Sequence, residues 1–522
     1  MKKILIALMF STIYINSFAE TVFRKGNDSE PATLDPAFAQ GMPEMHILRD
    51  LFVGLVDEAA DASLIPGVAE SWDISEDGKT YTFHLRPAKW SDSSPILAED
   101  FVYAWKRAVN PETGSKYAFF LYPIVNAQAI TEGKEKNLDT LGVKALDDHT
   151  LQVTLNHPTP YFLGMLVNAV TYPVPKAVVE KYGKEWTKPE HMVSNGAFTL
   201  SDWQPQAQVT LSKSSTYYGA DKVSLDKVIY YPTEEQSAAF KRYRAGELDF
   251  TSDIPSEQLQ WANEHLKDEV KISPYLGTFY YGFNLTKPPF KDNPKLREAL
   301  TLAVDRVPIT DKITAAGEVP TTSFVVEGIE HYTPYVPEYT KFSNEERLAR
   351  AKKAYAEAGY SKANPLKVEL LYNTNENNKK ISIALAAMWK QALGVETKLV
   401  NKEWKSYLTD RRNYDTQLFR GSWIGDYNDA NTFLDLFVTG GGSNTVGLDD
   451  PKYNQLIAEA AKETNTTKRA ELLHQAEKRL LDNYSLIPIY NFVSKHMVKS
   501  NVSGYVPNVM DHWQSKYITI NQ

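Results

Sequence analysis

The 522-residue sequence contains no cysteine. A fold without disulfides must rest on its hydrophobic core, and a chain of this length can bury enough apolar surface for two or three domains. The sequence also lacks a basic excess, because 57 Lys and Arg stand against 65 Asp and Glu and give a net charge of −8. Proteins that bind nucleic acid carry basic patches, so this composition argues against nucleic acid as a partner.

Long apolar runs are absent except at the N-terminus. There, residues 4–15 form an apolar run behind two lysines, and the small residue Ala19 ends the segment. This pattern predicts a secretory signal peptide over residues 1–19, cleaved near Ala19. The run is too short to span a membrane, and no cysteine at the cleavage point could carry a lipid. We therefore expect a free protein of the Gram-negative periplasm.

The common enzyme motifs are missing. The sequence has no GxSxG, GxxxxGK[ST], HExxH or GxGxxG pattern, and its ten histidines include no pair at metal-ligand spacing. Residues 426–429 resemble the start of a calcium-binding loop, but the glycine and glutamate of later loop positions are absent. These gaps favour a binding protein over an enzyme. We expect no catalytic residues, no metal and no cofactor.

Aromatic residues, by contrast, are abundant. They make up 12% of the chain, with 30 Tyr and 10 Trp. Many of these rings must lie in the core, but such a surplus also suits a large pocket lined by amphipathic rings.

Short runs of strand periodicity alternate with helical patterns. Residues 98–109 place Phe101, Val102, Trp105 and Ala108 at helical spacing behind an acidic first turn. The periodicity predicts further helices at 295–304, 345–358, 381–393 and 467–481, and strands at 81–85, 151–155 and 209–211. Strands interleaved with helices predict an α/β protein with mixed sheets.

The segment 418–429, LFRGSWIGDYND, concentrates chemistry near the C-terminus. Arg420, Trp423 and Asp426 lie within seven residues bordered by glycines. An unpaired charge is costly to bury, so Arg420 and Asp426 must pair, stay in water or meet a charged ligand. Two interpretations follow: a surface loop with an ion pair, or a site for a ligand with an amine at one end and a carboxylate at the other.

Several further segments, taken in order, resemble the solute-binding proteins of peptide ABC importers (solute-binding protein family 5), among them the periplasmic oligopeptide-binding proteins of Gram-negative bacteria. Each match is short, but together they cover nearly the whole mature chain. The matching residues are Thr33-Leu34-Asp35-Pro36, Arg49-Asp50-Leu51-Phe52, Pro66-Gly67-Val68-Ala69-Glu70-Ser71-Trp72, 97–111, Asn195-Gly196-Ala197-Phe198, Tyr243-Arg244-Ala245-Gly246-Glu247, 280–290, Arg297-Glu298-Ala299-Leu300, Glu403-Trp404-Lys405 and 418–429.

This resemblance implies a two-lobed periplasmic binding protein with mixed sheets, a hinge and an additional inserted domain. Lobes of this kind close over a ligand like a hinged clamp. The expected parts are a first lobe from residues 20–52, 177–277 and 494–522, an inserted domain from residues 53–176, and a second lobe from residues 278–493.

The implied function is capture of oligopeptides, biased to short ones, and their delivery to an inner-membrane ABC permease by a monomeric receptor. In the family the peptide lies extended between the lobes and is held mainly by its main chain and terminal charges. The same fold could instead bind a murein tripeptide or another non-standard solute, such as a bile acid. A periplasmic hydrolase or a peptide-holding chaperone is the alternative from a different class.

The resemblance also implies roles for single residues. Asp426 matches the carboxylate that receives the α-ammonium of the peptide, and Arg420 matches a basic residue that binds the C-terminal carboxylate of short peptides. Trp404 and Trp423 match aromatic walls of side-chain pockets, and Tyr117 matches a cleft tyrosine of the inserted domain. The remaining expected ligand-binding positions are Gln40, Met42, Asn378 and Phe492.

Several of these positions depart from the family pattern. They are Gln40 for a glutamate, Thr314 and Asn378 for a lysine and a histidine that bind the C-termini of longer peptides, Phe492 for a tyrosine, Gly282 for a pocket glutamate, and Gly277 and Ile424 for two cysteines. The loss of the C-terminal cations besides Arg420 predicts a bias toward short peptides, such as tripeptides. The loss of both cysteines accounts for the missing disulfide.

Overall fold

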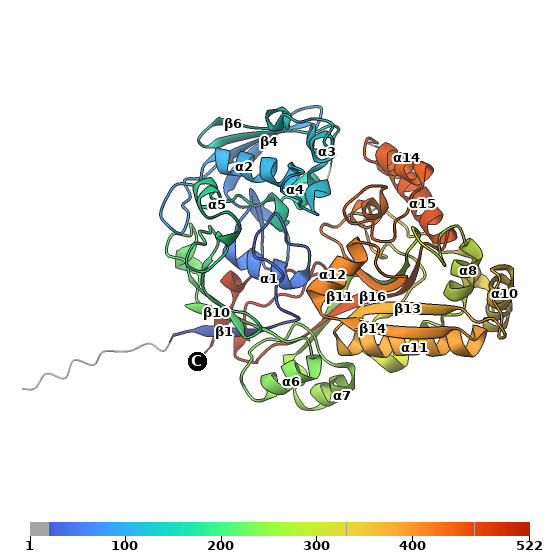
Figure 1. Cartoon of the computed structure of the whole chain (residues 1–522). Coiled ribbons are helices and arrows are strands. Elements are labelled where there is room, and N and C mark those ends of the chain that lie inside the picture. The colour runs from blue at the N-terminus through green and yellow to red at the C-terminus, as the bar shows by residue number, and fades with distance from the viewer. Residues whose placement is uncertain (1–19, 160, 330, 464, 522) are drawn as a thin grey trace, which may run out of the picture.

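The computed structural model describes residues 20–521 apart from 160, 330 and 464. The expected signal peptide, residues 1–19, lies outside the described residues. Two large bodies stand side by side, and the inserted domain sits on the first of them (Figure 1). Within the described part of the chain, no helix is both long and apolar enough to cross a membrane.

The first lobe is built on a four-stranded sheet in the order β1-β10-β9-β8. β1 pairs with β10 in parallel although some 200 residues separate them, and the other pairs are antiparallel. The chain therefore leaves this lobe after its first helix and returns to it later. The elements are β1 Val22–Asn27, α1 Met42–Leu51, β8 Phe198–Gln204, β9 Gln208–Lys213, β10 Lys227–Pro232, α6 Gln236–Arg244, α7 Ser256–His265, β17 Val502–Ser503 and β18 Thr519–Ile520.

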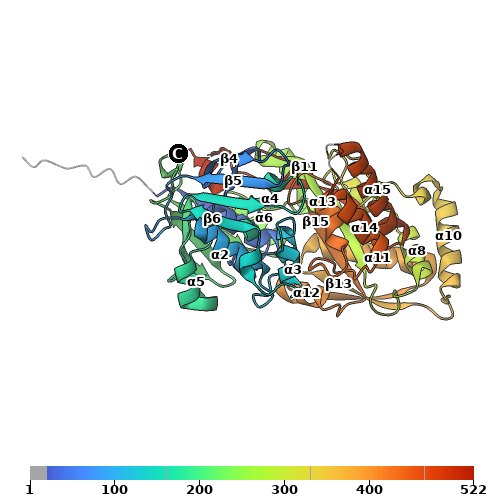
Figure 2. The same cartoon turned by 90° about the horizontal axis from the view of Figure 1, so that it is seen from above.

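The inserted domain contains its own antiparallel sheet, in the order β4-β5-β7-β6, covered by helices (Figure 2). The helix predicted at 98–109 is confirmed as α2, whose Phe101, Trp105 and Ala108 are buried. The elements are β2 Val56–Glu58, β3 Leu64–Pro66, β4 Ala69–Ile74, β5 Thr80–Leu85, α2 Ala98–Val109, α3 Ala127–Thr131, β6 Val143–Asp147, β7 Thr150–Thr154, α4 Phe162–Met165 and α5 Lys176–Tyr182.

The second lobe holds a six-stranded mixed sheet in the order β12-β16-β11-β15-β13-β14. Its strands are β11 Val270–Phe283, β12 Val319–Pro320, β13 Lys367–Asn373, β14 Glu396–Lys402, β15 Leu418–Ile424 and β16 Leu486–Met497. Its helices are α8 Pro294–Leu302, α9 Val307–Ile309, α10 Asn344–Glu357, α11 Glu376–Leu393, α12 Trp404–Arg412, α13 Asn431–Leu434, α14 Pro451–Ala460 and α15 Thr466–Asp482.

Helices cover both faces of this sheet because successive strand residues point to opposite sides. Phe279 and Tyr281 of β11 pack into the core formed with α8, α10 and α11. Leu276 and Tyr280 of the same strand pack into the core formed with α13, α14 and α15. The sheet is therefore buried on both faces, and its strands are correspondingly rich in apolar residues.

Two long strands, β11 and β16, connect the lobes. They pair antiparallel from Gly282↔Leu486 in the second lobe to Val270↔Met497, and Phe250 of the first lobe bridges to Val498 just beyond β16. Their register shifts between Pro274 and Thr278. The boundaries expected at 277/278 and 493/494 fall inside these two strands, so we expect any motion between the lobes to bend β11 and β16.

The predicted helices and strands are confirmed, with shifts at their ends. The largest shift is in α11, which begins at Glu376 and not at Ile381. Asn375 caps this helix, because its side chain accepts a hydrogen bond from the Asn378 backbone N–H at 3.0 Å. The first residues of α11 are polar, so the spacing of apolar residues did not reveal where the helix begins.

The two positions at which the family resemblance implies cysteines face each other. Gly277 on β11 pairs with Ile424 on β15, and a Cβ added to Gly277 would lie 2.3 Å from Ile424 Cδ1. The larger side chain on one strand thus fills the space that the glycine leaves on the other. Packing therefore joins the two strands at this point.

Candidate functional site

A cleft of about 210 Å³ lies between the two lobes. Five of the expected ligand-binding residues line it: Met42 on α1, Asn378 on α11, Trp404 on α12, Arg420 on β15 and Phe492 on β16. They come from segments far apart in the sequence, and the packing of the two lobes brings them together. We refer to this space as the interlobe cleft.

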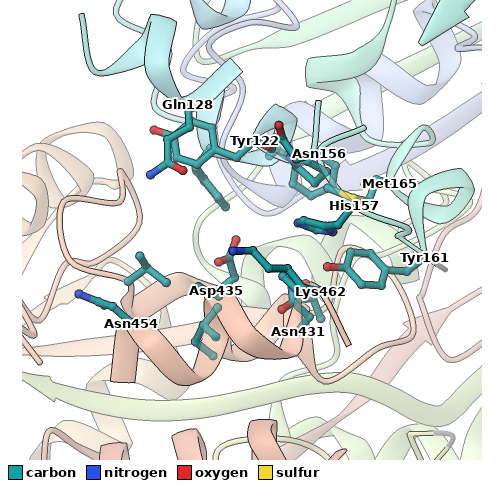
Figure 3. Close-up of a pocket in the computed structure, with 18 of the residues that line it drawn as sticks. Tyr122, Gln128, Asn156, His157, Tyr161, Met165, Asn431, Asp435, Asn454 and Lys462 are labelled. Atoms are coloured by element: carbon teal, nitrogen blue, oxygen red, sulfur yellow. Dashed lines mark hydrogen bonds between the residues drawn. The ribbon is translucent and has the colours of Figure 1, made fainter. Parts of the chain in front are cut away.

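Trp423 and Asp426 line a different space. It is a cavity of about 740 Å³ between the inserted domain and the second lobe (Figure 3). Alternation along β15 explains the division, because Arg420, Ser422 and Ile424 point to the interlobe cleft and Trp423 points to the other side. We refer to this space as the lateral cavity. The charge of Asp426 nevertheless contributes, after the larger effect of burial, to raising the pKa of Tyr275, which lines the interlobe cleft.

The interpretation of segment 418–429 as a surface loop with an ion pair is wrong. Residues 418–424 form the partly buried strand β15, and Arg420 and Asp426 do not form an ion pair. Asp426 instead accepts a hydrogen bond from Asn168 Nδ2 of the inserted domain at 3.0 Å. Arg420 and Asp426 line different spaces because Arg420 lies on β15 and Asp426 lies in the turn after it.

Asp426 is held in a desolvated position. Its backbone N–H donates to Thr432 Oγ1 at 3.0 Å, which fixes the turn after β15. Removal from water raises the pKa of its carboxyl to about 7, although nearby Arg49 and the hydrogen bond from Asn168 lower it. A cationic group beside Asp426 would therefore relieve an unfavourable burial.

Asn168 has a fixed orientation. Its Oδ1 accepts a hydrogen bond from the Val170 backbone N–H at 3.1 Å, so its Nδ2 must face Asp426. Asn168 is 6% exposed. Sequence reasoning missed this residue, because nothing in the local pattern relates it to a position 258 residues away.

Arg420 carries a charge without an acidic partner among the described residues. Its guanidinium lies 4.8 Å from the centre of the Phe279 ring, and its buried Nε has no hydrogen-bond partner. A guanidinium presents paired donors that match a carboxylate. Arg420 can therefore receive an acidic group in the interlobe cleft.

The two expected aromatic residues of the cleft lie as follows. Trp404 stacks on Tyr407 with ring centres 5.6 Å apart, and its buried Nε1 has no hydrogen-bond partner in the part of the chain that the structure describes. Phe492 packs edge-on against Tyr490 and Phe279. Trp404 thus offers both an apolar face and a free donor.

Gln40 and Tyr117 line neither space. Gln40 Nε2 donates to the Phe38 carbonyl at 3.4 Å. Tyr117 is 6% exposed and packs on Phe119 and Phe120. The charge of Asp426 nevertheless contributes to raising the pKa of Tyr117, after the larger effect of burial, so the two side chains are neighbours. Their proposed contact with a ligand stays a prediction.

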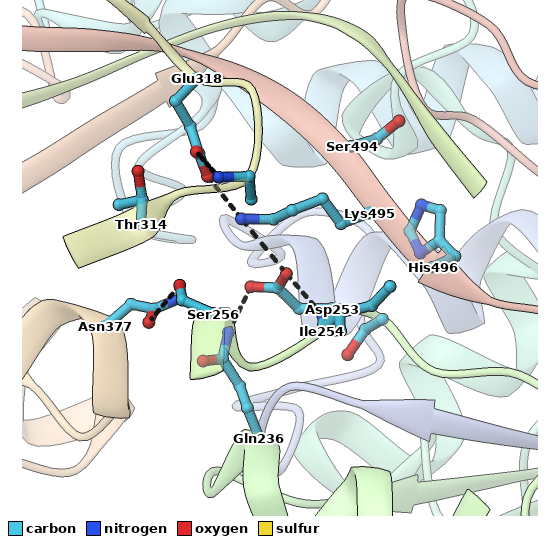
Figure 4. A network of polar contacts seen from close by, with 12 residues as sticks. Gln236, Asp253, Ile254, Ser256, Thr314, Glu318, Asn377, Ser494, Lys495 and His496 are labelled. Atoms are coloured by element: carbon cyan, nitrogen blue, oxygen red, sulfur yellow. Dashed lines mark hydrogen bonds and ion pairs between the residues drawn. The ribbon is translucent and has the colours of Figure 1, made fainter. Parts of the chain in front are cut away.

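A buried charge network closes one side of the interlobe cleft (Figure 4). Lys495 on β16 pairs with Glu318 at 2.5 Å and with Asp253 of the first lobe at 3.6 Å. Gln236 donates a hydrogen bond to Asp253. Sequence reasoning also missed Lys495, whose charge is neutralised by these two carboxylates and is not free to bind an anion.

Thr314 and Asn378, where the family resemblance implies a lysine and a histidine, are both hydrogen-bonded within the protein. Thr314 is 1% exposed, and its hydroxyl donates to the Thr310 carbonyl at 3.2 Å. Asn378 Nδ2 donates to Asn373 Oδ1 at 3.0 Å. Neither side chain carries a charge, so Arg420 is the free cation among the described residues that line this cleft.

The described residues contain no group of three or more His, Asp or Glu side chains that could hold a metal ion. The cleft instead offers main-chain strand edges, rings and isolated charges. This arrangement is suited to holding an extended polar molecule.

Comparison with known proteins agrees with this geometry. Residues 63–445 match the family described as bacterial extracellular solute-binding proteins, family 5. The chain is 42% identical to the periplasmic oligopeptide-binding protein OppA of Escherichia coli, over 92% of this chain and 89% of that protein. It is 40% identical to the periplasmic murein peptide-binding protein MppA of Escherichia coli, over 96% and 95% of the two chains.

Solved structures also indicate the state of the lobes. The structure of Haemophilus influenzae OppA in complex with RPPGFSPFR matches with a TM-score of 0.94, 38% identity and coverage of 96% of this chain and 99% of that chain. One structure of Escherichia coli MppA matches equally well, at 0.94 and 39% identity over 96% and 99% of the chains. Its unliganded open form matches at only 0.66, over 96% and 97%.

The lobes therefore stand as in the peptide complex and not as in the open form. Contacts between α6 or α7 and α11 join them, among which Ser237 donates from its backbone N–H to Glu376 at 3.0 Å and Lys380 pairs with Glu257 at 2.5 Å. A family match over most of the chain, a two-lobed fold and an interlobe cleft lead to one assignment. The chain belongs to the bacterial extracellular solute-binding proteins of family 5.

Proposed function

We propose that this protein is a periplasmic receptor that captures short oligopeptides between its lobes and delivers them to an inner-membrane ABC permease. The observation that carries the proposal is a pair of charges: neither Arg420 on β15 nor Asp426 just after it forms an ion pair with the described residues. A peptide brings an ammonium and a carboxylate to these two positions. OppA and MppA, which are named for peptide binding, support it.

In this proposal Asp426 binds the α-ammonium of the peptide and Arg420 binds its carboxylate. Trp404, Phe492, Met42 and Asn378 line the cleft around the peptide main chain. Trp423, Tyr117 and Gln40 act near its amino end. Each terminal contact is charge-assisted and contributes about 1.5–3 kcal/mol in such surroundings.

The domain limits and the processing of the chain belong to the same proposal. The first lobe comprises residues 20–52, 177–277 and 494–522, the inserted domain residues 53–176 and the second lobe residues 278–493. Export removes residues 1–19, and the mature receptor acts as a monomer without catalytic activity or a cofactor. Closure about β11 and β16 traps the ligand.

A murein tripeptide or another non-standard solute is the second candidate ligand. The similarity to MppA favours it, since that protein is named for murein peptide binding. Gln40, Gly282 and Phe492 also replace a glutamate, a glutamate and a tyrosine of the family pattern, which makes the cleft less like that of an ordinary oligopeptide receptor.

Mass spectrometry of the ligand released from the purified protein by unfolding tests both candidates. We expect peptides of two to four residues or a murein tripeptide, and the refolded, ligand-free protein should bind trialanine in calorimetry without cleaving it. Release of only non-peptide molecules together with no trialanine binding would reject a peptide receptor. Cleavage of the peptide would indicate the hydrolase alternative.

A further inference from the structure

The lateral cavity contains a carboxylate that no described residue satisfies. Asp435, directly after α13, forms no ion pair and no side-chain hydrogen bond with the described residues. Figure 3 shows its carboxylate rising from the helix into the cavity. Removal from water alone raises the pKa of this carboxyl to about 6. A carboxylate in such a position calls for a cation or a donor from outside the protein.

A second side chain, one turn before Asp435, points to the same conclusion. Asn431 is 6% exposed and lines the lateral cavity. Its Nδ2 donates to the Tyr427 hydroxyl at 3.2 Å, whereas its buried Oδ1 has no hydrogen-bond partner among the residues that the structure describes. Buried amide oxygens are nearly always hydrogen-bonded, so this acceptor is also open to a ligand.

Aromatic rings form the walls around these acceptors. Tyr122 and Tyr161 come from the inserted domain, and Trp423 and Tyr427 come from the second lobe. Tyr161 stacks on Tyr427 with ring centres 4.9 Å apart and an angle of 2° between the planes. Ring faces attract cations and bury methylene groups. Acceptors without donors beside ring faces suit an aliphatic chain that ends in an ammonium.

The cations near the cavity do not neutralise Asp435. Lys134 pairs with Glu132 at 2.5 Å. Lys462 is exposed and forms no ion pair with the described residues. His157 has a pKa below its usual value because of burial, so it is uncharged at neutral pH. The negative charge at Asp435 thus remains available.

We propose that the lateral cavity is a second binding site, which takes an aliphatic primary ammonium at Asp435 and Asn431 Oδ1 between the rings of Tyr122 and Trp423. Two sources share this chemistry. One is the side chain of a basic first residue in a peptide whose α-ammonium is held at Asp426, which lines the same cavity; this source rests on the proposed function. The other is a free aliphatic diamine.

Calorimetry on the refolded, ligand-free protein distinguishes the sources. The peptide arm compares Lys-Ala-Ala with norleucine-Ala-Ala, which has the same chain without the charge, and with Ala-Ala-Lys. The amine arm titrates 1,5-diaminopentane alone. Both arms are repeated with Asp435→Asn and with Glu471→Gln, which makes the same change of charge at an exposed position of α15.

We expect Lys-Ala-Ala to bind about tenfold more tightly than norleucine-Ala-Ala, with no such gain for Ala-Ala-Lys. Asp435→Asn should abolish the gain, and Glu471→Gln should keep it. Binding of the diamine that Asp435→Asn abolishes would support the site with a free amine as its ligand, even if no peptide bound. If Asp435→Asn fails to fold, the affinities of the unmodified protein for the three peptides decide whether the lysine side chain is bound.

Equal affinities for the lysine and norleucine peptides, together with no binding of the diamine, would overturn the second site. In that case binding of trialanine would leave the proposed function standing. A gain for lysine, or binding of the diamine, that persists in Asp435→Asn would also overturn it. If no peptide binds, but the diamine binds and Asp435→Asn abolishes that binding, the proposed function is rejected and the second site is kept.

Discussion

Asn168 of the inserted domain donates a hydrogen bond to Asp426 of the second lobe, with 3.0 Å between Nδ2 and Oδ1. The inserted domain thereby takes part in holding the carboxylate to which we assign the ammonium of the ligand. The contact joins two bodies that meet in this closed arrangement. Asn168 should therefore link the position of the lobes to the electrostatics of Asp426.

Asn168→Ala should weaken the binding of trialanine by about tenfold at pH 7, because a hydrogen bond to a charged group contributes about 1.5–3 kcal/mol. Without this bond the pKa of Asp426 should rise further, so the loss should shrink at pH 9, where the carboxyl is ionised in both proteins. Calorimetry at the two pH values measures this. The exposed Asn501→Ala serves as the control, and an equal loss at both pH values would argue against an electrostatic role.

Asp426→Asn should weaken the binding of trialanine by at least about tenfold, because the ammonium then loses its counter-charge. N-acetyl-trialanine should bind poorly to the unmodified protein for the same reason. The exposed Asp449→Asn removes one negative charge outside the cleft and should leave the affinity unchanged. Equal affinities for the acetylated and the free peptide would contradict the role of Asp426.

Affinity should also depend on pH through Asp426. The pKa of this carboxyl is raised to about 7 by burial, so protonation competes with the ammonium as the pH falls below 7. Trialanine affinity should then fall by up to about tenfold per pH unit between 7 and 5. The affinity of Asp426→Asn should stay nearly level over this range. A profile that is equally steep in both proteins would assign the effect to other groups.

The same raised pKa predicts a change in the stability of the ligand-free protein. A carboxyl whose pKa is higher in the folded than in the unfolded chain destabilises the fold above the folded pKa, and this cost disappears as the pH falls toward the unfolded value of about 4. Asp426→Asn should therefore melt a few degrees (~2–4 °C) higher than the unmodified protein at pH 8, with no difference near pH 4. Calorimetric melting curves measure both values.

The protein should prefer short peptides. Thr314 and Asn378 carry no charge, and Lys495 is neutralised by Glu318 and Asp253, so Arg420 is the cation left to bind a C-terminal carboxylate. Trialanine should bind about tenfold more tightly than pentaalanine, and Arg420→Gln should remove this preference. Calorimetry with the two peptides checks it. Bound ligands of five or more residues in the purified protein would contradict it.

The network around Lys495 should matter for stability more than for binding. Glu318→Gln leaves the buried Lys495 with only Asp253 as a partner and should cost about 3 kcal/mol in the free energy of unfolding. The double variant Glu318→Leu with Lys495→Met should recover most of this loss, because both charges are gone. Denaturant unfolding measures the three proteins. If the double variant is as unstable as Glu318→Gln, the loss of stability comes from packing and not from the unpaired charge of Lys495.

The sequence determined the elements of the fold and the family of the protein. The apolar spacing of residues 98–109 gives α2 with the predicted ends, because a helix places those side chains on one face whatever surrounds it. The ordered motifs identified a solute-binding protein of family 5. Arg420 and Asp426 were recognisable as charges in need of partners, because burying either alone is costly.

Only the tertiary structure decided where those charges act. The alternation of β15 separates Arg420 from Trp423, and the turn after it places Asp426 in a cavity that exists only because the inserted domain packs against the second lobe. Asn168 and Asp435 gain their significance from this packing. Local periodicity records which face of a strand or helix is buried, but contacts between residues 258 apart depend on how whole lobes dock, which no local pattern encodes.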